Sequence, residues 1–153
     1  MKTVLIAVDD SKGSQTTIDT FAGLFSCTRP DTVVLLYVEK IEGKSLMDEM
    51  LGMAELSTLK EQLQGTAYQD ALDKKAQAVL EHYKQALNKK GVTGIKTVVK
   101  QGHPSDEVLQ TAKDVGAEMI IVGSRGKRLH TLMMGSVSRE IANRAEIPVL
   151  IAR

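Results

Sequence analysis

Three short apolar segments constrain the fold of this chain more than any other feature. They span Thr3–Val8 (TVLIAV), Thr32–Val38 (TVVLLYV) and Glu118–Val122 (EMIIV), and they are rich in β-branched residues. A strand that is apolar along its whole length is buried on both faces, which is typical of the centre of a parallel sheet. The sequence therefore predicts a parallel sheet with helices on both of its faces.

Two further segments are predicted to form the edges of this sheet. Ile95–Lys100 alternates in polarity, and Ile147–Ala152 contains Pro148, which cannot donate a hydrogen bond inside a ladder. Helical patterns separate the five segments, and right-handed crossovers place helices on both faces. The predicted fold is an open five-stranded parallel sheet of the Rossmann-like α/β class, with strand order 3-2-1-4-5. Its switch point, where ligands bind, lies between strands 1 and 4 at their carboxyl ends.

Four helices are predicted between the strands, with recognisable starting residues. The first follows Ser11 or Ser14 as its cap, the longest covers about Tyr68–Lys89, and the last follows Gly135 or Ser136. The helix between strands 3 and 4 carries a proline in its first turn, a position that proline favours. The alternation of strands and helices therefore continues to the end of the sequence.

The length of the chain predicts one domain over residues 1–153, with a hydrophobic fraction of 42% that suffices for a core. Residues 41–67 do not fit the alternation, and Met47, Met50 and Met53 suggest a short amphipathic helix within a flexible Met-rich insertion. One interpretation is an arm that packs loosely over the sheet. The other is a lid or a partner-binding surface, because methionine adapts to varied shapes.

Composition excludes several classes of function. The net charge is +1 and the chain has three Tyr, two Phe and no Trp, so we expect no nucleic-acid partner. No segment approaches the about 18 apolar residues of a membrane span, so we expect no membrane partner. The single Cys27 excludes an internal disulfide, is predicted to pack on a helix, and favours a cytoplasmic location.

The segment Ile120–Glu140 (IIVGSRGKRLHTLMMGSVSRE) has the composition of an anion site. Glycines after a strand and before a helix leave backbone N–H groups open to an oxyanion, and a helix N-terminus adds further donors. The predicted glycines, hydroxyl donors and cations are Gly123, Gly126, Gly135, Ser136, Ser138, Arg125, Lys127 and Arg128. Together they favour phosphate binding over an ordinary glycine-rich connection, although Arg128 stands where a Walker A loop needs Ser or Thr.

An acidic pair, Asp9 and Asp10, follows the first strand. These carboxylates could hold Mg²⁺, accept hydrogen bonds from ribose hydroxyls, or cap the first helix. A response-regulator receiver is excluded because no Asp follows the third strand. The histidines His82, His103 and His130 lack a spacing typical of metal ligands.

These segments give the chain a resemblance to the universal stress protein family over essentially its whole length. The resemblance is carried by VLIAVDDS, VVLLYV, KQGHPSDEVL, EMIIVGSRG and GSVSREIANRAEIPVLI. Nucleotide-binding members have the motif G-x2-G-x9-G-[ST], and here the glycines read Gly123-x2-Gly126-x8-Gly135-Ser136. The loop is one residue short, which leaves the contacts of Lys127–His130 open.

The resemblance implies a site for ATP, or for AMP or ADP, with Mg²⁺ or Mn²⁺ bound through the phosphates. Ala7 and Val38 would border the adenine and Asp9 would hold the ribose hydroxyls. The full set of implied nucleotide-binding residues is Ala7, Val8, Asp9, Ser11, Val38, Val122, Gly123, Ser124, Arg125, Gly126, Lys127, Gly135, Ser136, Val137 and Ser138. The resemblance also implies a homodimer that pairs through the last strand.

The function expected from this reasoning is a cytoplasmic stress-response regulator that ATP switches between states read by an unknown client protein. Binding without catalysis is favoured, because no convincing general base is found apart from Asp9 or Asp10. Two alternatives stay open. The chain could be a weak ATPase or autophosphorylating enzyme, or a protein-interaction adaptor that binds no nucleotide.

Overall fold

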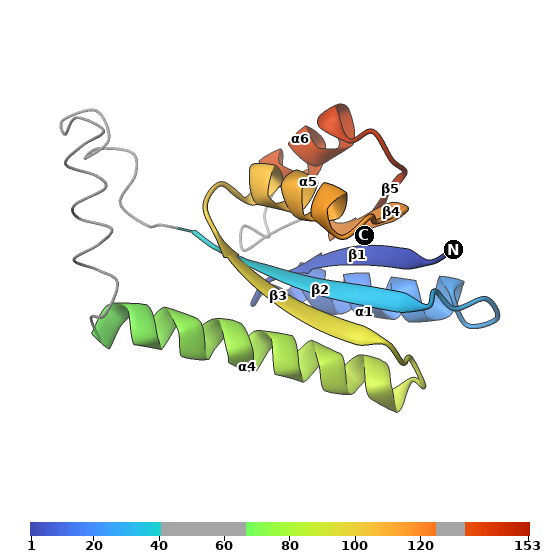
Figure 1. Ribbon diagram of the computed structural model, residues 1–153, viewed down its shortest axis with the longest axis horizontal. Coiled ribbons are helices and arrows are strands. Elements are labelled where there is room, and N and C mark those ends of the chain that lie inside the picture. The colour runs from blue at the N-terminus through green and yellow to red at the C-terminus, as the bar shows by residue number, and fades with distance from the viewer. Residues whose placement is uncertain (41–66, 125–133) are drawn as a thin grey trace.

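A computed structural model describes residues 1–40, 67–124 and 134–153, which form a parallel sheet between two layers of helices (Figure 1). The strands are β1 (Thr3–Val8), β2 (Thr32–Glu39), β3 (Ile95–Gln101), β4 (Met119–Gly123) and β5 (Val149–Ala152). The helices are α1 (Lys12–Leu24), α4 (Ala67–Lys89), α5 (Pro104–Asp114) and α6 (Ser136–Arg144). The observed order β3-β2-β1-β4-β5 confirms the predicted topology.

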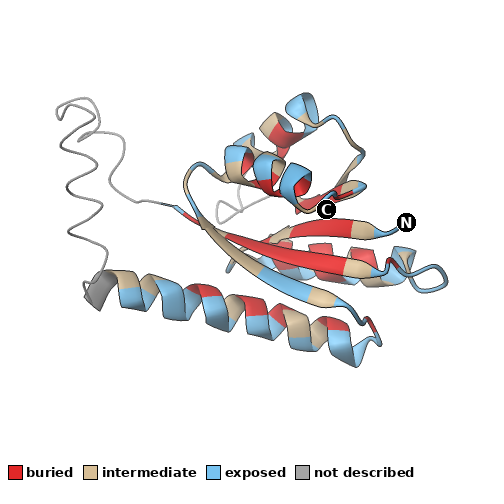
Figure 2. Cartoon of the chain, in the orientation of Figure 1, coloured by how far each residue is buried: buried red, intermediate tan, exposed pale blue. Residues whose placement is uncertain are grey.

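Each face of the sheet carries its own hydrophobic core. On one face, alternate residues of β1 and β2 pack against Ile18 and Phe21 of α1 and Leu80 of α4. On the other face, the remaining residues pack against Val108 of α5 and Ile141 of α6. The central strands are accordingly buried along most of their length (Figure 2). Burying one such side chain contributes about 1.5–3 kcal/mol, so this two-sided core fixes the sheet between its helices.

The ends of the elements follow from local chemistry. Pro104 occupies the first turn of α5, where a missing N–H costs nothing. Helix α4 ends before Gly91, whose φ of 77° a residue with a side chain rarely adopts. Strand β5 begins after Pro148, whose carbonyl still accepts a 2.9 Å hydrogen bond from the Ile120 N–H. The predicted strand Ile147–Ala152 is therefore shorter in the structure.

One prediction about the fold is wrong. Cys27 is exposed and lies in the turn after α1, so it does not pack on a helix.

The predicted Met-rich insertion lies outside the described residues apart from Ala67, which begins α4. Among the helices of the described ranges, none has both the length and the apolar character that crossing a bilayer requires.

Candidate functional site

The carboxyl ends of β1 and β4 lie side by side, as the strand order requires. Their register pairs Ile6 with Ile121, and its continuation places Val8 beside Gly123. Neighbouring strands are about 4.8 Å apart. The first turn of α1, which follows the acidic turn, also reaches β4 directly, because a Cβ on Gly123 would lie 3.1 Å from the Gly13 carbonyl oxygen. The acidic turn and the first glycine of the predicted phosphate loop therefore meet at one edge of the sheet.

Asp9 is held in a fixed orientation by the serines that follow it. Its Oδ1 accepts hydrogen bonds from the Ser11 N–H at 2.9 Å, from the Ser11 hydroxyl, and from the Ser14 hydroxyl at 2.8 Å. Its own N–H donates to Ser14 Oγ at 2.7 Å. Within the described part of the chain, Oδ2 accepts no hydrogen bond. The half-buried Asp9 thus presents one unengaged carboxylate oxygen, which suits the hydroxyls of a ribose.

The neighbouring Asp10 has a different role. Its Oδ2 forms a 2.8 Å ion pair with Nζ of Lys75 on α4. Ser11 occupies the N-cap position of α1, but its side chain makes no capping bond and turns to Asp9 instead. Asp10 therefore forms an ion pair with α4, a role that the sequence did not predict, and Asp9 lies at the sheet edge.

The start of α6 provides open backbone donors at the same edge. Gly135 is its N-cap; its N–H donates to the Ser124 carbonyl at 2.8 Å, and its own carbonyl accepts from Arg139. The N–H groups of Ser136, Val137 and Ser138 donate to no acceptor among the described residues. Free N–H groups at the positive end of a helix favour an anion. Since Ser124 directly follows β4, these donors are tied to the strand end.

Two serines of the predicted site use their polar groups within the protein. The buried Ser138 hydroxyl lies 3.1 Å from the Gly135 carbonyl and 3.5 Å from the Ser124 carbonyl. Ser124 donates its N–H to the Ala152 carbonyl at 2.7 Å. Within the described residues the Ser138 hydroxyl thus contacts two backbone carbonyls, while its backbone N–H has no acceptor, and its role toward a phosphate stays a prediction.

The space available for a side chain differs between the two described glycines of the motif, Gly123 and Gly135. A Cβ on Gly123 would lie 3.1 Å from the Gly13 carbonyl and 3.2 Å from Thr17 Oγ1, so α1 takes the space of a side chain. A Cβ on Gly135 would meet the Ser124 carbonyl at 3.4 Å, an ordinary contact. Packing against α1 therefore explains Gly123, whereas packing alone does not require a glycine at position 135.

An apolar wall lies beside these polar groups. Ala7 and Val38 are half-buried at the ends of β1 and β2, and they belong to the same core as Val122 and Val137, on the face covered by α5 and α6. Val8 is buried in the opposite core, so only its backbone can reach a ligand on this face. A half-buried aliphatic wall at a strand end is a suitable surface for a flat aromatic ring.

Two buried tyrosines lie on the α4 side of the acidic turn. Burial raises the pKa of Tyr37, with an opposing contribution from Lys75. Burial, followed by the charge of Asp9, raises the pKa of Tyr83, and the Ser14 hydroxyl opposes that rise. Both phenols are therefore neutral near neutral pH and add no charge to the edge.

The structure thus brings together twelve of the predicted residues from four segments, namely Ala7, Val8, Asp9, Ser11, Val38, Val122, Gly123, Ser124, Gly135, Ser136, Val137 and Ser138. Arg125, Gly126 and Lys127 lie outside the described residues. A hollow of about 510 Å³ lies elsewhere, between α5 and α6, and none of the predicted residues lines it. Sequence reasoning missed the clamp by Ser14 and the contacts of Gly13 and Thr17, although the Asp9–Ser11 spacing is typical of an Asx turn.

Comparison with known proteins decides the family. Residues 1–153 match the universal stress protein family along the whole chain. This chain belongs to the universal stress protein family. Universal stress protein MJ0577 of Methanocaldococcus jannaschii is 28% identical over 133 residues, which cover 84% of this chain and 81% of the relative.

Solved structures of other universal stress proteins share the fold. The structure of MJ0577 has a TM-score of 0.70 at 25% identity and covers 99% of this chain and 94% of its own. A universal stress protein in complex with cAMP has a TM-score of 0.65 at 19% identity, covering 99% and 96%. One from Archaeoglobus fulgidus in complex with dAMP has a TM-score of 0.60 at 17% identity, covering 100% and 98%.

Proposed function

We propose that this universal stress protein binds an adenine nucleotide at the carboxyl edge of β1 and β4, with ATP as the full ligand and AMP or ADP as alternatives. Bound nucleotide acts as a switch that a client protein reads. By linkage, the client then changes the nucleotide affinity by the same factor as the nucleotide changes client affinity. The proposal includes a homodimer that pairs through β5.

The observation that carries this proposal is the adjacency of a fixed carboxylate and a set of open amides. The free Oδ2 of Asp9 is an acceptor for ribose hydroxyls, and the N–H groups of Ser136–Ser138 are donors for phosphate oxygens. The wall of Ala7 and Val38 is a surface for the base. A carboxylate alone repels phosphates, so the separation of acceptor and donors suits a ligand that is neutral at one end and anionic at the other.

The solved relatives support the choice of an adenine nucleotide. Two of them are complexes with cAMP and dAMP, and both share the fold of this chain. Each ligand contains an adenine, a sugar and one phosphate. The proposed base contact is common to both ligands, whereas cAMP keeps only the 2′-hydroxyl and dAMP only the 3′-hydroxyl of the two that Asp9 would bind in ATP.

The proposed Mg²⁺ or Mn²⁺ binds through the phosphates. Asp9 Oδ1 already accepts hydrogen bonds from Ser11 and Ser14, and Asp10 is paired with Lys75. These two side chains therefore fit a site in which the nucleotide supplies most metal ligands. When bound, the ion neutralises phosphate charge.

The proposal is tested by identifying what the purified protein carries and then measuring its affinity. Heat extraction followed by mass spectrometry should release an adenine nucleotide. Calorimetry should then show MgATP binding by the emptied protein and weakened binding by Gly126→Val. Gly23→Val is the matched control, because a Cβ on Gly23 meets no atom within 4 Å. Absence of ATP binding by the wild type, or equal binding by Gly126→Val, would contradict the proposal.

A further inference from the structure

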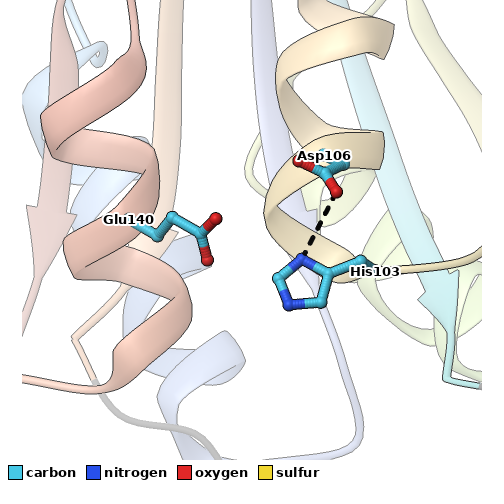
Figure 3. A group of neighbouring side chains, drawn as sticks. All are labelled: His103, Asp106 and Glu140. Atoms are coloured by element: carbon cyan, nitrogen blue, oxygen red, sulfur yellow. Dashed lines mark ion pairs between the residues drawn. The ribbon is translucent and has the colours of Figure 1, made fainter. Parts of the chain in front are cut away.

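A second cluster of ligand-type side chains lies between α5 and α6. His103 precedes α5, Asp106 lies in its first turn, and Glu140 comes from α6 (Figure 3). One ligand atom from each residue lies within 4.8 Å of the others. In Figure 3 the Glu140 carboxylate points across the gap toward the imidazole. A nitrogen and two carboxylates from different helices therefore surround one point.

The imidazole and the Asp106 carboxylate make no direct hydrogen bond to each other. His103 Nδ1 lies 3.7 Å from Asp106 Oδ2, which is longer than a hydrogen bond. Two ligands that share one ion, with bonds of about 2.0–2.2 Å, are separated by about 3–4 Å. The three ligand atoms lie within 4.8 Å of one another, so a change in the side-chain torsions of the half-buried Glu140 would bring its carboxylate to this spacing.

Arg144 orients both carboxylates from the side. Its Nη1 lies 2.7 Å from Asp106 Oδ1 and 2.8 Å from Glu140 Oε1. One oxygen of each carboxylate is thereby occupied, and the other oxygen of Asp106, Oδ2, faces His103. Two carboxylates and one guanidinium leave a net negative charge, which a cation would balance. Such outer contacts fix the orientation of metal ligands in proteins.

The side chain of Ser105 holds the imidazole of His103 in place. Its buried hydroxyl lies 2.8 Å from His103 Nδ1. The same hydroxyl is the largest cause that lowers the pKa of Glu140, so it serves both ligand groups. The Ser105 hydroxyl therefore lies close to both the imidazole and the Glu140 carboxylate.

We propose that His103, Asp106 and Glu140 bind one divalent transition-metal ion of the zinc, cobalt or nickel class. One imidazole with two carboxylates suits these ions better than Mg²⁺, which prefers oxygen ligands alone. Water completes the coordination, because His103 and Asp106 are exposed. None of these three residues belongs to the nucleotide site proposed above, and the ion would link α5 to α6 independently of nucleotide.

The test uses the full-length protein, stripped with chelator and free of nucleotide. Titration with Zn²⁺ should give one site per chain, and Co²⁺ should produce a visible absorption spectrum typical of a protein-bound ion. His103→Asn, which retains a good N-cap residue for α5, and Glu140→Gln should each weaken Zn²⁺ binding at least about tenfold. His82→Ala is the matched control, since His82 is exposed on α4 and lies outside the cluster.

The outcomes separate clearly. Loss of binding in His103→Asn and Glu140→Gln, with His82→Ala unchanged and excess Mg²⁺ unable to compete, supports the proposal. Circular dichroism confirms that each variant is folded. The proposal is overturned if the wild type does not bind Zn²⁺ or Co²⁺, or if His103→Asn binds Zn²⁺ as the wild type does.

Discussion

The Ser14 hydroxyl lies 2.8 Å from Asp9 Oδ1 and 2.7 Å from the Asp9 backbone nitrogen. One buried hydroxyl therefore fixes both the position of the Asp9 backbone and the direction of its carboxylate. Because Ser14 lies in the first turn of α1, the helix that covers β1 also sets the geometry of the residue that ends it. The candidate site is thus built into the packing of the fold.

Replacing Ser14 with alanine should lower both stability and nucleotide affinity. The Asp9 N–H and carboxylate each lose a partner, which costs about 1–3 kcal/mol in a partly buried setting. Urea denaturation measures the loss, and Ser26→Ala is the control, since Ser26 is exposed and its hydroxyl contacts the Gly23 carbonyl and Cys27 Sγ at the surface. Equal stabilities of Ser14→Ala and wild type would show that the Ser14 hydroxyl does not stabilise the position of Asp9.

The two described glycines should respond differently to alanine. Gly123→Ala places a Cβ 3.1 Å from the Gly13 carbonyl, and overpacking of this kind costs about 1–3 kcal/mol. Gly135→Ala meets its nearest atom at 3.4 Å and should cost less than about 1 kcal/mol, mainly through the weaker N-cap. Thermal or urea unfolding of the two variants side by side tests this order, and a reversed order would contradict it.

The Arg144 ion pairs should make stability depend on acid pH. Hydrogen bonding from Arg144 lowers the pKa of Asp106 below its ordinary 3.8, and hydrogen bonds from Ser105 and Arg144 lower that of Glu140 below 4.5. A carboxyl whose pKa is lowered by folding stabilises the fold above its ordinary pKa, and this contribution disappears as pH falls through the lowered value.

The variant Arg144→Gln should therefore be less stable than wild type near neutral pH, with the difference shrinking as the pH falls below about 4. Urea unfolding in chelator measures this, so that bound metal does not contribute. Asp106 is exposed and Glu140 is only half-buried, so the effect on stability should be small and should decrease with added salt. A difference that grows toward acid pH would contradict the assignment.

The proposed dimer should depend on the outer edge of β5. Ile120 N–H donates to the Pro148 carbonyl and Ser124 N–H to the Ala152 carbonyl, so the alternate residues Val149 and Ile151 direct their N–H groups away from β4. Ile151→Pro removes one outward donor and should give a monomer by light scattering, whereas Ile151→Val should stay dimeric. A monomeric wild type, or a dimeric Ile151→Pro, would contradict this pairing.

The topology was predictable because burial on both faces leaves a continuous apolar run, as in Thr3–Val8, while edge strands show alternation or proline. The meeting of Asp9 and the α6 N-terminus followed from that topology. The hydrogen bonds of Ser14 to Asp9 and the proximity of Glu140 to His103 could not be predicted from the sequence. Both depend on how helices pack rather than on local periodicity. Cys27 was misplaced because α1 ends at Leu24, before Cys27 is reached.

The central claim is that Asp9 presents its free oxygen to a bound nucleotide. Asp9→Asn tests this with little structural change, because the asparagine Oδ1 still accepts from Ser11 and Ser14 while Oδ2 becomes an N–H donor. Calorimetry with MgATP should show one site per wild-type chain and about a tenfold or greater loss of affinity in Asp9→Asn, at unchanged unfolding free energy. Equal affinity of Asp9→Asn and wild type for MgATP would contradict the account.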